Sequence, residues 1–336
     1  MRLITISHLR QIIRRTGMDD FLRQSLSALE AAFSRWHEFR KSPRHATHYP
    51  HGVIELMPCA DDDYYSFKYV NGHPKNTAEG RLSIVALGML ADARNGYPLM
   101  LSEMTLLTAI RTAATTALGA KYLARTESRH LAMIGTGAQA EFQLLATRQV
   151  LPIEQVSYFD TDPRAMQKFA RNMAACAGLI PCRSIDQAIV DADMIITATA
   201  ARLHNQLLGP GMIRPGSHIH AMGGDCPGKT ELDPALLQQC KIVVEYLPQS
   251  LAEGEIQLSQ ETPIHAELWE LVNGSKPGRE EPLEVTLFDS VGFALEDYAV
   301  LRLVYQLACD LDIGDDVELT PSPADPKDLY STLLSP

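Results

Sequence analysis

A short apolar run that ends in a Gly-x-Gly turn constrains this chain more than any other stretch. Residues 131–134 read Leu-Ala-Met-Ile, and the turn at Gly135 and Gly137 leads directly into good helix formers. That order predicts a strand, a tight turn and a helix, which is the first βα unit of a dinucleotide-binding fold. Gly135 permits the turn, Gly137 lets the backbone approach a pyrophosphate, and Ala140 is small enough for the helix to pack on the strand. By itself, the motif is equally compatible with a plain tight turn.

A second predicted strand at residues 155–159 supports the interpretation of the glycine turn as a dinucleotide-binding motif. It ends at Asp160, 23 residues past Gly137. An acidic side chain at this place accepts hydrogen bonds from the adenosine ribose 2′-hydroxyl, whereas a 2′-phosphate would meet Asp160 and Asp162 as like charges. We therefore predict that the cofactor is NAD rather than NADP. Capping of the helix that begins at Pro163 is compatible with this role.

Length and charge bound the class of protein. The 336 residues, 46% of them hydrophobic, are enough for two domains with a core each. A formal net charge of −11 argues against a nucleic-acid partner, which calls for basic patches. Charged residues interrupt the N-terminal apolar run after four residues, so we expect neither a signal peptide nor a membrane span. Six cysteines without a C-x-x-C pair are typical of a reduced, cytoplasmic protein.

The first hundred residues predict an α+β domain with an antiparallel sheet. Apolar positions at helical spacing predict a helix over residues 19–39. The stretch from Lys41 to His51 is polar and basic and contains no predicted strand. The predicted strands cover residues 52–58, 64–70, 81–91 and 99–102. A long alanine- and leucine-rich helix over 105–125 then leads into the nucleotide-binding part.

From residue 131 onward, strands and helices alternate, which predicts a Rossmann-type, doubly wound parallel sheet. Predicted helices cover 163–177, 233–239 and 295–311, and the further predicted strands cover 193–197, 217–222, 242–245 and 285–288. The fold class is therefore α/β, with a second α+β domain. We place the α+β domain at residues 1–115 together with 300–336, and the nucleotide-binding domain at 116–299. The acidic tail over 310–328 reads as solvated surface.

Asp225 is the first candidate for chemistry. It follows the strand over 217–222 and two glycines, Gly223 and Gly224. Ligands of an open parallel sheet bind outside the carboxyl ends of its strands, so this carboxylate lies where a nicotinamide ring is expected. A turn aspartate that caps the next segment is the alternative. Residues 288–292 form a similar strand-end loop.

Three cations of the first domain could hold a substrate carboxylate. Arg44, Lys68 and Arg111 are each compatible with solvated surface, but Arg111 lies in an otherwise apolar helix. A carboxylate would give them a charge-assisted partner. Glu55, between two apolar strand residues, is only suggestive.

A metal site is not expected. His45, His48 and His51 are spaced three and three in a polar segment with no acidic partner nearby. Cys226 reads as a small packed residue rather than a nucleophile.

Several segments together resemble the ornithine cyclodeaminase and mu-crystallin family, and within it the bacterial ornithine cyclodeaminases. The resemblance runs over essentially the full length. It is carried by the sequences at residues 53–58, 68–74, 107–114, 134–139, 223–231 and 288–292. The most specific are Gly-Gly-Asp-Cys-Pro-Gly-Lys-Thr-Glu at 223–231 and Phe-Asp-Ser-Val-Gly at 288–292. In related lysine cyclodeaminases and ketimine reductases, the segments at 71–74 and 225–228 are expected to differ.

The resemblance implies roles for named residues. Arg44, Lys68 and Arg111 would hold the α-carboxylate, and Asp225 would be the catalytic acid and base. Glu55 would lie near the substrate amino groups, and Val291 would line the pocket. The residues that would touch NAD are Ser83, Arg111, Gly135, Gly137, Ala138, Gln139, Asp160, Thr199, Ile219, His220, Ala221, Met222, Lys229 and Ser290. Ser83 keeps the hydroxyl of a more common threonine, whereas His220 replaces a more usual asparagine. The family is dimeric through the sheet of the first domain, which implies a homodimer.

The activity implied is conversion of L-ornithine to L-proline and ammonia with NAD recycled in place. In this scheme Asp225 accepts the α-ammonium proton, the Cα hydride leaves, and the δ-amine closes a five-membered ring. The alternatives are a lysine cyclodeaminase, a ketimine reductase or amino-acid dehydrogenase of the same fold, and a crystallin-like NAD-binding protein without catalysis. Pocket length cannot be read from one sequence, so lysine stays open.

Overall fold

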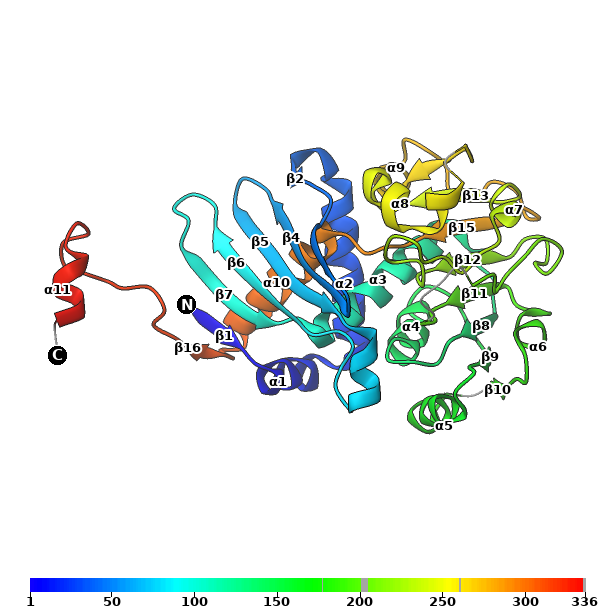
Figure 1. Cartoon of the computed structure of the whole chain (residues 1–336), viewed down its shortest axis with the longest axis horizontal. Helices are drawn as coiled ribbons and strands as arrows, with labels where there is room; N and C mark the ends of the chain where they lie inside the picture. Colours follow the sequence, from blue (N-terminus) through cyan, green and yellow to red (C-terminus); the bar gives the residue numbers. More distant parts are fainter. Residues whose placement is uncertain (177, 201–204, 260, 335–336) are drawn as a thin grey trace.

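Two eight-stranded sheets lie side by side in the computed structural model of the chain (Figure 1). The structure describes residues 1–176, 178–200, 205–259 and 261–334. The long helix α3 (Thr105–Leu123) runs between the sheets and packs on elements of both. Among the described helices, none has both the length and the apolar composition needed to cross a membrane.

The first sheet is antiparallel apart from one parallel pair, β1 with β7. Its order is β16-β1-β7-β6-β5-β4-β2, and β3 pairs with β4. The strands are β1 (Arg2–Ile4), β2 (Arg40–Lys41), β3 (His45–Tyr49), β4 (Gly52–Ala60), β5 (Tyr64–Gly72), β6 (Ala86–Asp92), β7 (Pro98–Glu103) and β16 (Asp315–Asp316). The antiparallel sheet predicted for the first hundred residues is present.

Helices cover one face of this sheet and leave the other open. The helices of this half are α1 (Ile6–Thr16), α2 (Met18–Ser34) and α10 (Ala294–Asp310), with 3-10 turns η1 (Trp36–Glu38) and η2 (Pro74–Glu79). Along β5 the alternation is clear, because Ser66, Lys68 and Val70 are buried under α10 while Tyr65 is exposed on the other face. The core beneath the sheet includes Leu90 and Met100.

The second sheet is parallel throughout, in the order β10-β9-β8-β11-β12-β15-β13-β14. Its strands are β8 (His130–Ile134), β9 (Gln155–Phe159), β10 (Leu179–Pro181), β11 (Met194–Thr197), β12 (His218–Ala221), β13 (Lys241–Val244), β14 (Ala266–Glu267) and β15 (Thr286–Asp289). The other elements are α4 (Ala140–Thr147), α5 (Pro163–Asn172), α6 (Ile185–Ile189), α7 (Pro234–Leu237), α8 (Leu247–Glu253), η3 (Glu255–Leu258) and α9 (Leu268–Val272). The α/β class with a Rossmann-type parallel sheet is confirmed.

Several secondary-structure predictions are wrong. The helix expected over residues 19–39 ends at Ser34, and the 3-10 turn η1 follows it. The strand expected over 81–91 begins only at Ala86, because η2 precedes it and the Asn71 side chain accepts a hydrogen bond from the Val85 N–H. The polar stretch before residue 52 contains β3, an edge strand whose five residues are all exposed. The helix predicted to 177 ends at Asn172, and residue 177 itself lies outside the described residues.

The two helices that join the halves are continuous through the predicted domain boundaries. Positions 115 and 116 lie within α3, and positions 299 and 300 lie within α10. The division into domains therefore stays a prediction. Beyond β16, the chain leaves the body, and α11 (Leu329–Leu334) lies apart from both sheets (Figure 1).

Candidate active site

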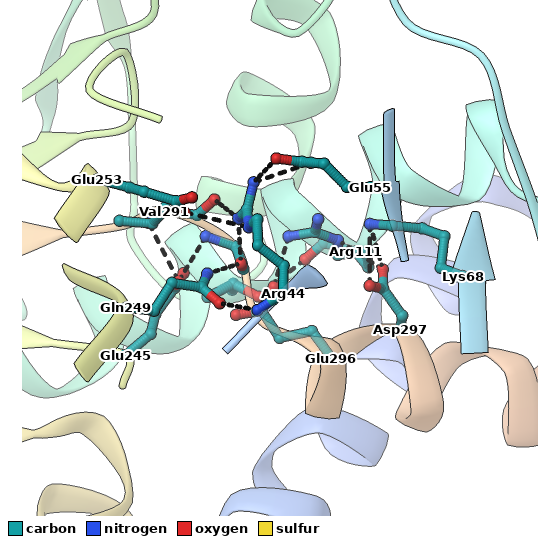
Figure 2. A network of polar contacts seen from close by, with 12 residues as sticks. Arg44, Glu55, Lys68, Arg111, Glu245, Gln249, Glu253, Val291, Glu296 and Asp297 are labelled. Atoms are coloured by element: carbon teal, nitrogen blue, oxygen red, sulfur yellow. Dashed lines mark hydrogen bonds and ion pairs between the residues drawn. The ribbon is translucent and has the colours of Figure 1, made fainter. Parts of the chain in front are cut away.

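Charged side chains from both halves of the molecule converge between the two sheets (Figure 2). The first half supplies Arg44, which precedes β3, together with Glu55 on β4 and Lys68 on β5. Arg111 projects from α3, and the start of α10 contributes two acidic residues. The second half supplies side chains from α8 and from the segment after β13. All of these side chains are largely removed from solvent.

Both terminal nitrogens of the Arg44 guanidinium donate hydrogen bonds, whereas its buried Nε makes an ion pair but no hydrogen bond within the described residues. Its Nη1 donates to both oxygens of Glu55, at 3.3 and 3.1 Å. Its Nη2 donates to the carbonyl oxygens of Val291 and Gly292, at 2.9 and 2.7 Å. Its Nε lies 3.1 Å from Glu253 Oε2. Burial opposes the charge, but Glu55, Glu253 and, more weakly, Asp225 together raise the pKa of Arg44.

Lys68 and Arg111 share a carboxylate. Asp297 lies 2.9 Å from Lys68 Nζ and accepts from Arg111 Nε at 3.0 Å, and Glu296 accepts from Arg111 Nη1 at 2.6 Å. Burial and then the charge of Arg111 lower the pKa of Lys68 to about 8. No hydrogen bond or ion pair within the described residues uses Arg111 Nη2. The pair of cations therefore retains donors for a further anion.

The loop after β15 holds Arg44 through its backbone. Glu245 accepts from Ser290 Oγ at 2.5 Å and from the N–H groups of Val291 and Gly292 at 3.1 and 2.6 Å. Gly292 has a φ of 85°, and a Cβ atom there would lie 2.5 Å from Arg111 Nη1. Only glycine fits this close approach, because both the backbone conformation and the space exclude a side chain.

The site holds more carboxylates than cations. Three cations, Arg44, Lys68 and Arg111, face five acidic side chains, which are Glu55, Glu245, Glu253, Glu296 and Asp297. Burial raises the pKa of Glu253 to about 7, and the charges of Glu55 and Asp225 add to that rise. Burial, with Glu245 nearby, also raises the pKa of Glu296. Such a site favours a ligand that brings positive charge of its own.

Sequence reasoning found the cations and Glu55 but missed the other acids. The acids Glu245, Glu253, Glu296 and Asp297 were not predicted, nor was the amide Gln249. Two adjacent acidic residues in the apolar first half of the helix over 294–310 were a signal that could have found Glu296 and Asp297. Nothing in the local sequence distinguishes Glu253 from a surface glutamate.

Asp225 lies at the rim of this cluster and is the most exposed of these acids. Its side chain is 45% exposed, and its Oδ1 accepts from Lys229 Nζ at 3.0 Å. Its charge acts on Arg44 and Glu253, so it belongs to the same site. It follows the end of β12, the position predicted from the sequence.

Three buried carboxylates support the loop that carries Asp225. Glu231 accepts from the backbone N–H and the hydroxyl of Thr199, Glu255 accepts from the N–H of Glu231, and Asp289 accepts from the N–H of Glu255. Burial raises the pKa of Glu255 to about 8 and that of Asp289 to about 7. A Cβ at Gly223 would lie 1.9 Å from the Glu231 carboxyl carbon, so the loop packs directly on this acid.

The turn after β8 has the features of a dinucleotide cradle. Gly135 has a φ of 97°, and a Cβ there would lie 2.5 Å from the Ala198 carbonyl oxygen. A Cβ at Gly137 would meet nothing within 4 Å. Asp160, at the end of β9, accepts from the Thr136 N–H at 2.6 Å. The N–H groups at positions 137–139 bond to nothing in the described part of the chain. Open space and free donors before α4 fit a pyrophosphate.

The remaining predicted cofactor residues divide into two groups. Thr199, Ala221, Met222, Lys229 and Ser290 lie at or just beyond strand ends on the side of Asp225, with Ile219 and His220 inside β12. His220 points the other way, since its Nε2 lies 2.8 Å from the Thr116 hydroxyl on α3, and burial lowers its pKa to about 3. Ser83 lies in the connection before β6, where its carbonyl accepts from the His73 N–H but its hydroxyl meets none of the described site residues.

The described residues contain no cluster of three or more metal-ligating side chains. His45 and His48 lie on β3 and are exposed, and His51 lies in the turn that follows. All six cysteines are free thiols.

A Rossmann-type sheet with an open glycine turn, joined to a second sheet by a buried cluster of opposite charges, defines a dinucleotide-fold enzyme. Comparison with known proteins narrows this class. A model of the ornithine cyclodeaminase/mu-crystallin family matches residues 8–311, and the chain belongs to that family.

Relatives and solved structures agree with that assignment. The chain is 46% identical to an ornithine cyclodeaminase of Agrobacterium tumefaciens (strain Ach5) over 332 residues, 98% of this chain and 93% of the relative. A lysine cyclodeaminase structure described as recognising L-lysine, L-ornithine and L-2,4-diaminobutyric acid matches with a TM-score of 0.92 and 30% identity, covering 99% of each chain. An archaeal alanine dehydrogenase dimer with bound NAD matches with a TM-score of 0.88 and 31% identity, covering 95% of this chain and 99% of that one.

Proposed function

We propose that this protein is an NAD-dependent ornithine cyclodeaminase that converts L-ornithine to L-proline and ammonia. The observation that carries the proposal is the composition of the buried site: three cations beside an excess of carboxylates, with Asp225 at the rim. L-Ornithine carries one carboxylate and two ammonium groups, so it matches both signs of charge. The names of relatives at 45–46% identity support the same activity.

The α-carboxylate of the substrate is held by Lys68, Arg111 and Arg44. Lys68 Nζ and Arg111 Nη2 have donors to spare. Both terminal nitrogens of Arg44 already donate to protein oxygens, so Arg44 exchanges one of these partners for the substrate. Glu55 and Glu253, which then pair less closely with Arg44, present their carboxylates to the ammonium groups of the substrate. Val291 supplies an apolar wall, 8% exposed in the unliganded site.

Asp225 acts as the base and then as the acid. Hydride can leave Cα only when the α-nitrogen has a free lone pair, so Asp225 first takes a proton from the α-ammonium group. The δ-ammonium group gives up a proton to water, and the resulting δ-amine attacks the imine carbon, the former Cα, to close a five-membered ring, which intramolecular proximity favours. Ammonia then leaves with the proton that Asp225 returns. Lys229, 3.0 Å from Asp225, stabilises the carboxylate before it takes the proton and after it returns it.

NAD fits the described turn. When bound, NAD accepts the Cα hydrogen as hydride and returns it to the cyclic imine. The N–H groups at positions 137–139 hold the pyrophosphate, and Asp160 holds the adenosine ribose and disfavours a 2′-phosphate. Thr199, Lys229, Ser290 and the end of β12 line the nicotinamide side, and Ser83 and Arg111 complete the predicted contacts. Because the net reaction is redox-neutral, the cofactor is recycled in place.

A homodimer through the first sheet accompanies this function. The face of that sheet opposite α10 carries exposed apolar side chains, among them Leu56, Tyr65 and Leu87. A solvent-facing sheet surface is normally polar, so this face is suited to an interface. We place substrate binding and dimerisation in residues 1–115 with 300–336, and NAD binding in 116–299. The free thiols support a reducing, cytoplasmic location.

The test compares substrates and products directly. Purified protein with NAD is given L-ornithine or L-lysine, and ammonia, proline or pipecolate, and NADH absorbance are followed. The proposal predicts ammonia and proline from ornithine, slower release from lysine, and no stoichiometric NADH. A steady build-up of NADH would instead indicate an amino-acid dehydrogenase, and absence of ammonia would indicate a binding protein. The Asp225→Asn variant should lose at least about 100-fold in kcat, because it lacks the acid and base.

A further inference from the structure

Lys168, on α5, reaches across to the glycine turn of the nucleotide-binding half. Its Nζ donates to the carbonyl oxygen of Gly137 at 2.7 Å and pairs with Glu141 Oε2 at 2.8 Å. Asn172, one turn further along α5, donates to Glu141 Oε1 at 2.9 Å. The Lys168 side chain is 30% exposed, and the ion pair at this surface contributes little to stability. The hydrogen bond to Gly137 is the unusual part of this arrangement.

The geometry of the peptide gives that hydrogen bond a consequence. The described peptide bonds include no cis bond, so the unit joining Gly137 and Ala138 is planar and trans. In a trans peptide the C=O and the N–H point in opposite directions. When Lys168 holds the Gly137 oxygen on the α5 side, the Ala138 N–H is directed to the opposite side.

Two observations fit the binding of an anion at this turn. The Ala138 N–H bonds to nothing in the described part of the chain, as do its neighbours at 137 and 139. The space over Gly137 is open to at least 4 Å from a Cβ position. Gly137 and Ala138 are themselves exposed, so without Lys168 this peptide could rotate and turn its oxygen toward the anion.

We infer that Lys168 is a positioning residue for the cofactor pyrophosphate. It fixes the Gly137–Ala138 peptide so that an N–H, not a carbonyl oxygen, faces the phosphate before the ligand arrives. A donor oriented in advance costs no reorganisation on binding. This inference rests on the proposed NAD site but adds a residue outside the glycine turn to it.

The test measures binding of two probes to the full chain, one with the pyrophosphate and one without. ADP-ribose is titrated by calorimetry, and adenosine by ligand-detected NMR. Two variants change Lys168: Lys168→Met removes the donor to the Gly137 oxygen, and Lys168→Arg keeps one. The control, Asn172→Ala, removes a neighbouring α5 contact to Glu141 and leaves Lys168 in place. Melting temperatures confirm that each variant is folded.

We expect Lys168→Met to bind ADP-ribose about tenfold more weakly, or about 1.4 kcal/mol, with adenosine binding unchanged. Lys168→Arg should recover most of the loss, and Asn172→Ala should stay within about twofold of the unmodified chain. Unchanged ADP-ribose affinity in Lys168→Met would overturn the inference, as would an equal loss of adenosine or an equal loss in Asn172→Ala. If the unmodified chain bound neither ADP-ribose nor NAD, the cofactor proposal itself would fail first.

Discussion

The carboxylate of Asp297 holds two buried cations at once, with Lys68 Nζ 2.9 Å away and Arg111 Nε 3.0 Å away. Asp297 lies in the first turn of α10, where the helix dipole favours a negative charge. Without this acid the two cations would repel each other in a site from which water is largely excluded. Asp297 therefore influences both the position and the protonation of Lys68, the lysine proposed to bind the substrate carboxylate.

Replacing Asp297 by asparagine should weaken substrate binding and move its pH dependence. The pKa of Lys68, already lowered to about 8, should fall further once its acidic partner is neutral. In the unmodified enzyme, KM for ornithine should rise as the pH passes above about 8, because Lys68 loses its proton there. In Asp297→Asn that rise should begin at lower pH, with a stability loss of about 3–5 kcal/mol. Steady-state kinetics from pH 6.5 to 9.5 would give KM against pH for the unmodified enzyme and for Asp297→Asn, with the exposed Asp316→Asn as control. Coincident curves for the unmodified enzyme and Asp297→Asn would refute the dependence of Lys68 on Asp297.

Glu253 should determine how KM for ornithine changes with pH between 6 and 8. Its pKa is raised to about 7, so it becomes an anion between pH 6 and 8 and then attracts the cationic substrate. We expect KM to fall about fivefold over that interval in the unmodified enzyme. In Glu253→Gln this fall should be absent and KM high throughout. The exposed Glu318→Gln serves as control, and a preserved fall of KM in Glu253→Gln would show that another group is responsible.

Alanine substitutions at two glycines should distinguish the cost of backbone strain from damage to the active site. Gly292 and Gly274 both have positive φ, 85° and 74°, but a Cβ at Gly292 would press on Arg111 whereas one at Gly274 would meet nothing within 4 Å. Alanine at Gly274 should cost about 1 kcal/mol of stability and leave activity intact. Alanine at Gly292 should cost about 1–3 kcal/mol and lower kcat/KM at least about 100-fold. Urea unfolding and kinetics on the two variants would decide; equal activity in both would contradict the close packing.

His220 should make the protein sensitive to acid. Burial lowers its pKa from 6.5 to about 3, so between these values the unfolded chain binds a proton that the folded chain does not. The free energy of unfolding should therefore decrease as the pH falls from 6.5, by up to about 1.4 kcal/mol per pH unit for this group. His220→Asn should flatten that decrease, measured as urea midpoints at pH 7, 6 and 5. The control His51→Asn, at an exposed position, should leave the decrease unchanged. Parallel plots of urea midpoint against pH for the two variants would contradict the assignment of acid sensitivity to His220.

The fold was predictable where the pattern is local. The apolar run, the glycine turn and Asp160 lie within 30 residues, and the geometry of one βα unit relates them directly. Boundaries that depend on distant partners were not predictable. β3 consists of exposed polar residues and pairs only along an edge of the sheet, so it lacks the alternation that marks a half-buried strand.

The three cations of the site were predictable, but of its acids only Glu55 and Asp225 were singled out from the sequence. Arg111 stood out because charge is unusual in an apolar helix, and Lys68 belonged to a segment that carries the family resemblance. Arg44 lies outside those segments, and its role was implied by the resemblance as a whole. Their anionic partners are far along the chain: Glu253 is 209 residues from Arg44, and Asp297 is 229 residues from Lys68. Only the tertiary packing that brings α8 and the start of α10 next to these cations assembles the site.

The most direct test of the account follows the hydrogen at Cα. L-Ornithine deuterated at Cα is incubated with the enzyme and with much less NAD than ornithine. The proline formed is analysed by mass spectrometry and NMR. Internal transfer to a retained cofactor and back predicts many turnovers per NAD, with deuterium still at Cα of proline and one ammonia released for each proline. Proline without the deuterium, or NADH formed in step with the loss of ornithine, would contradict the central claim.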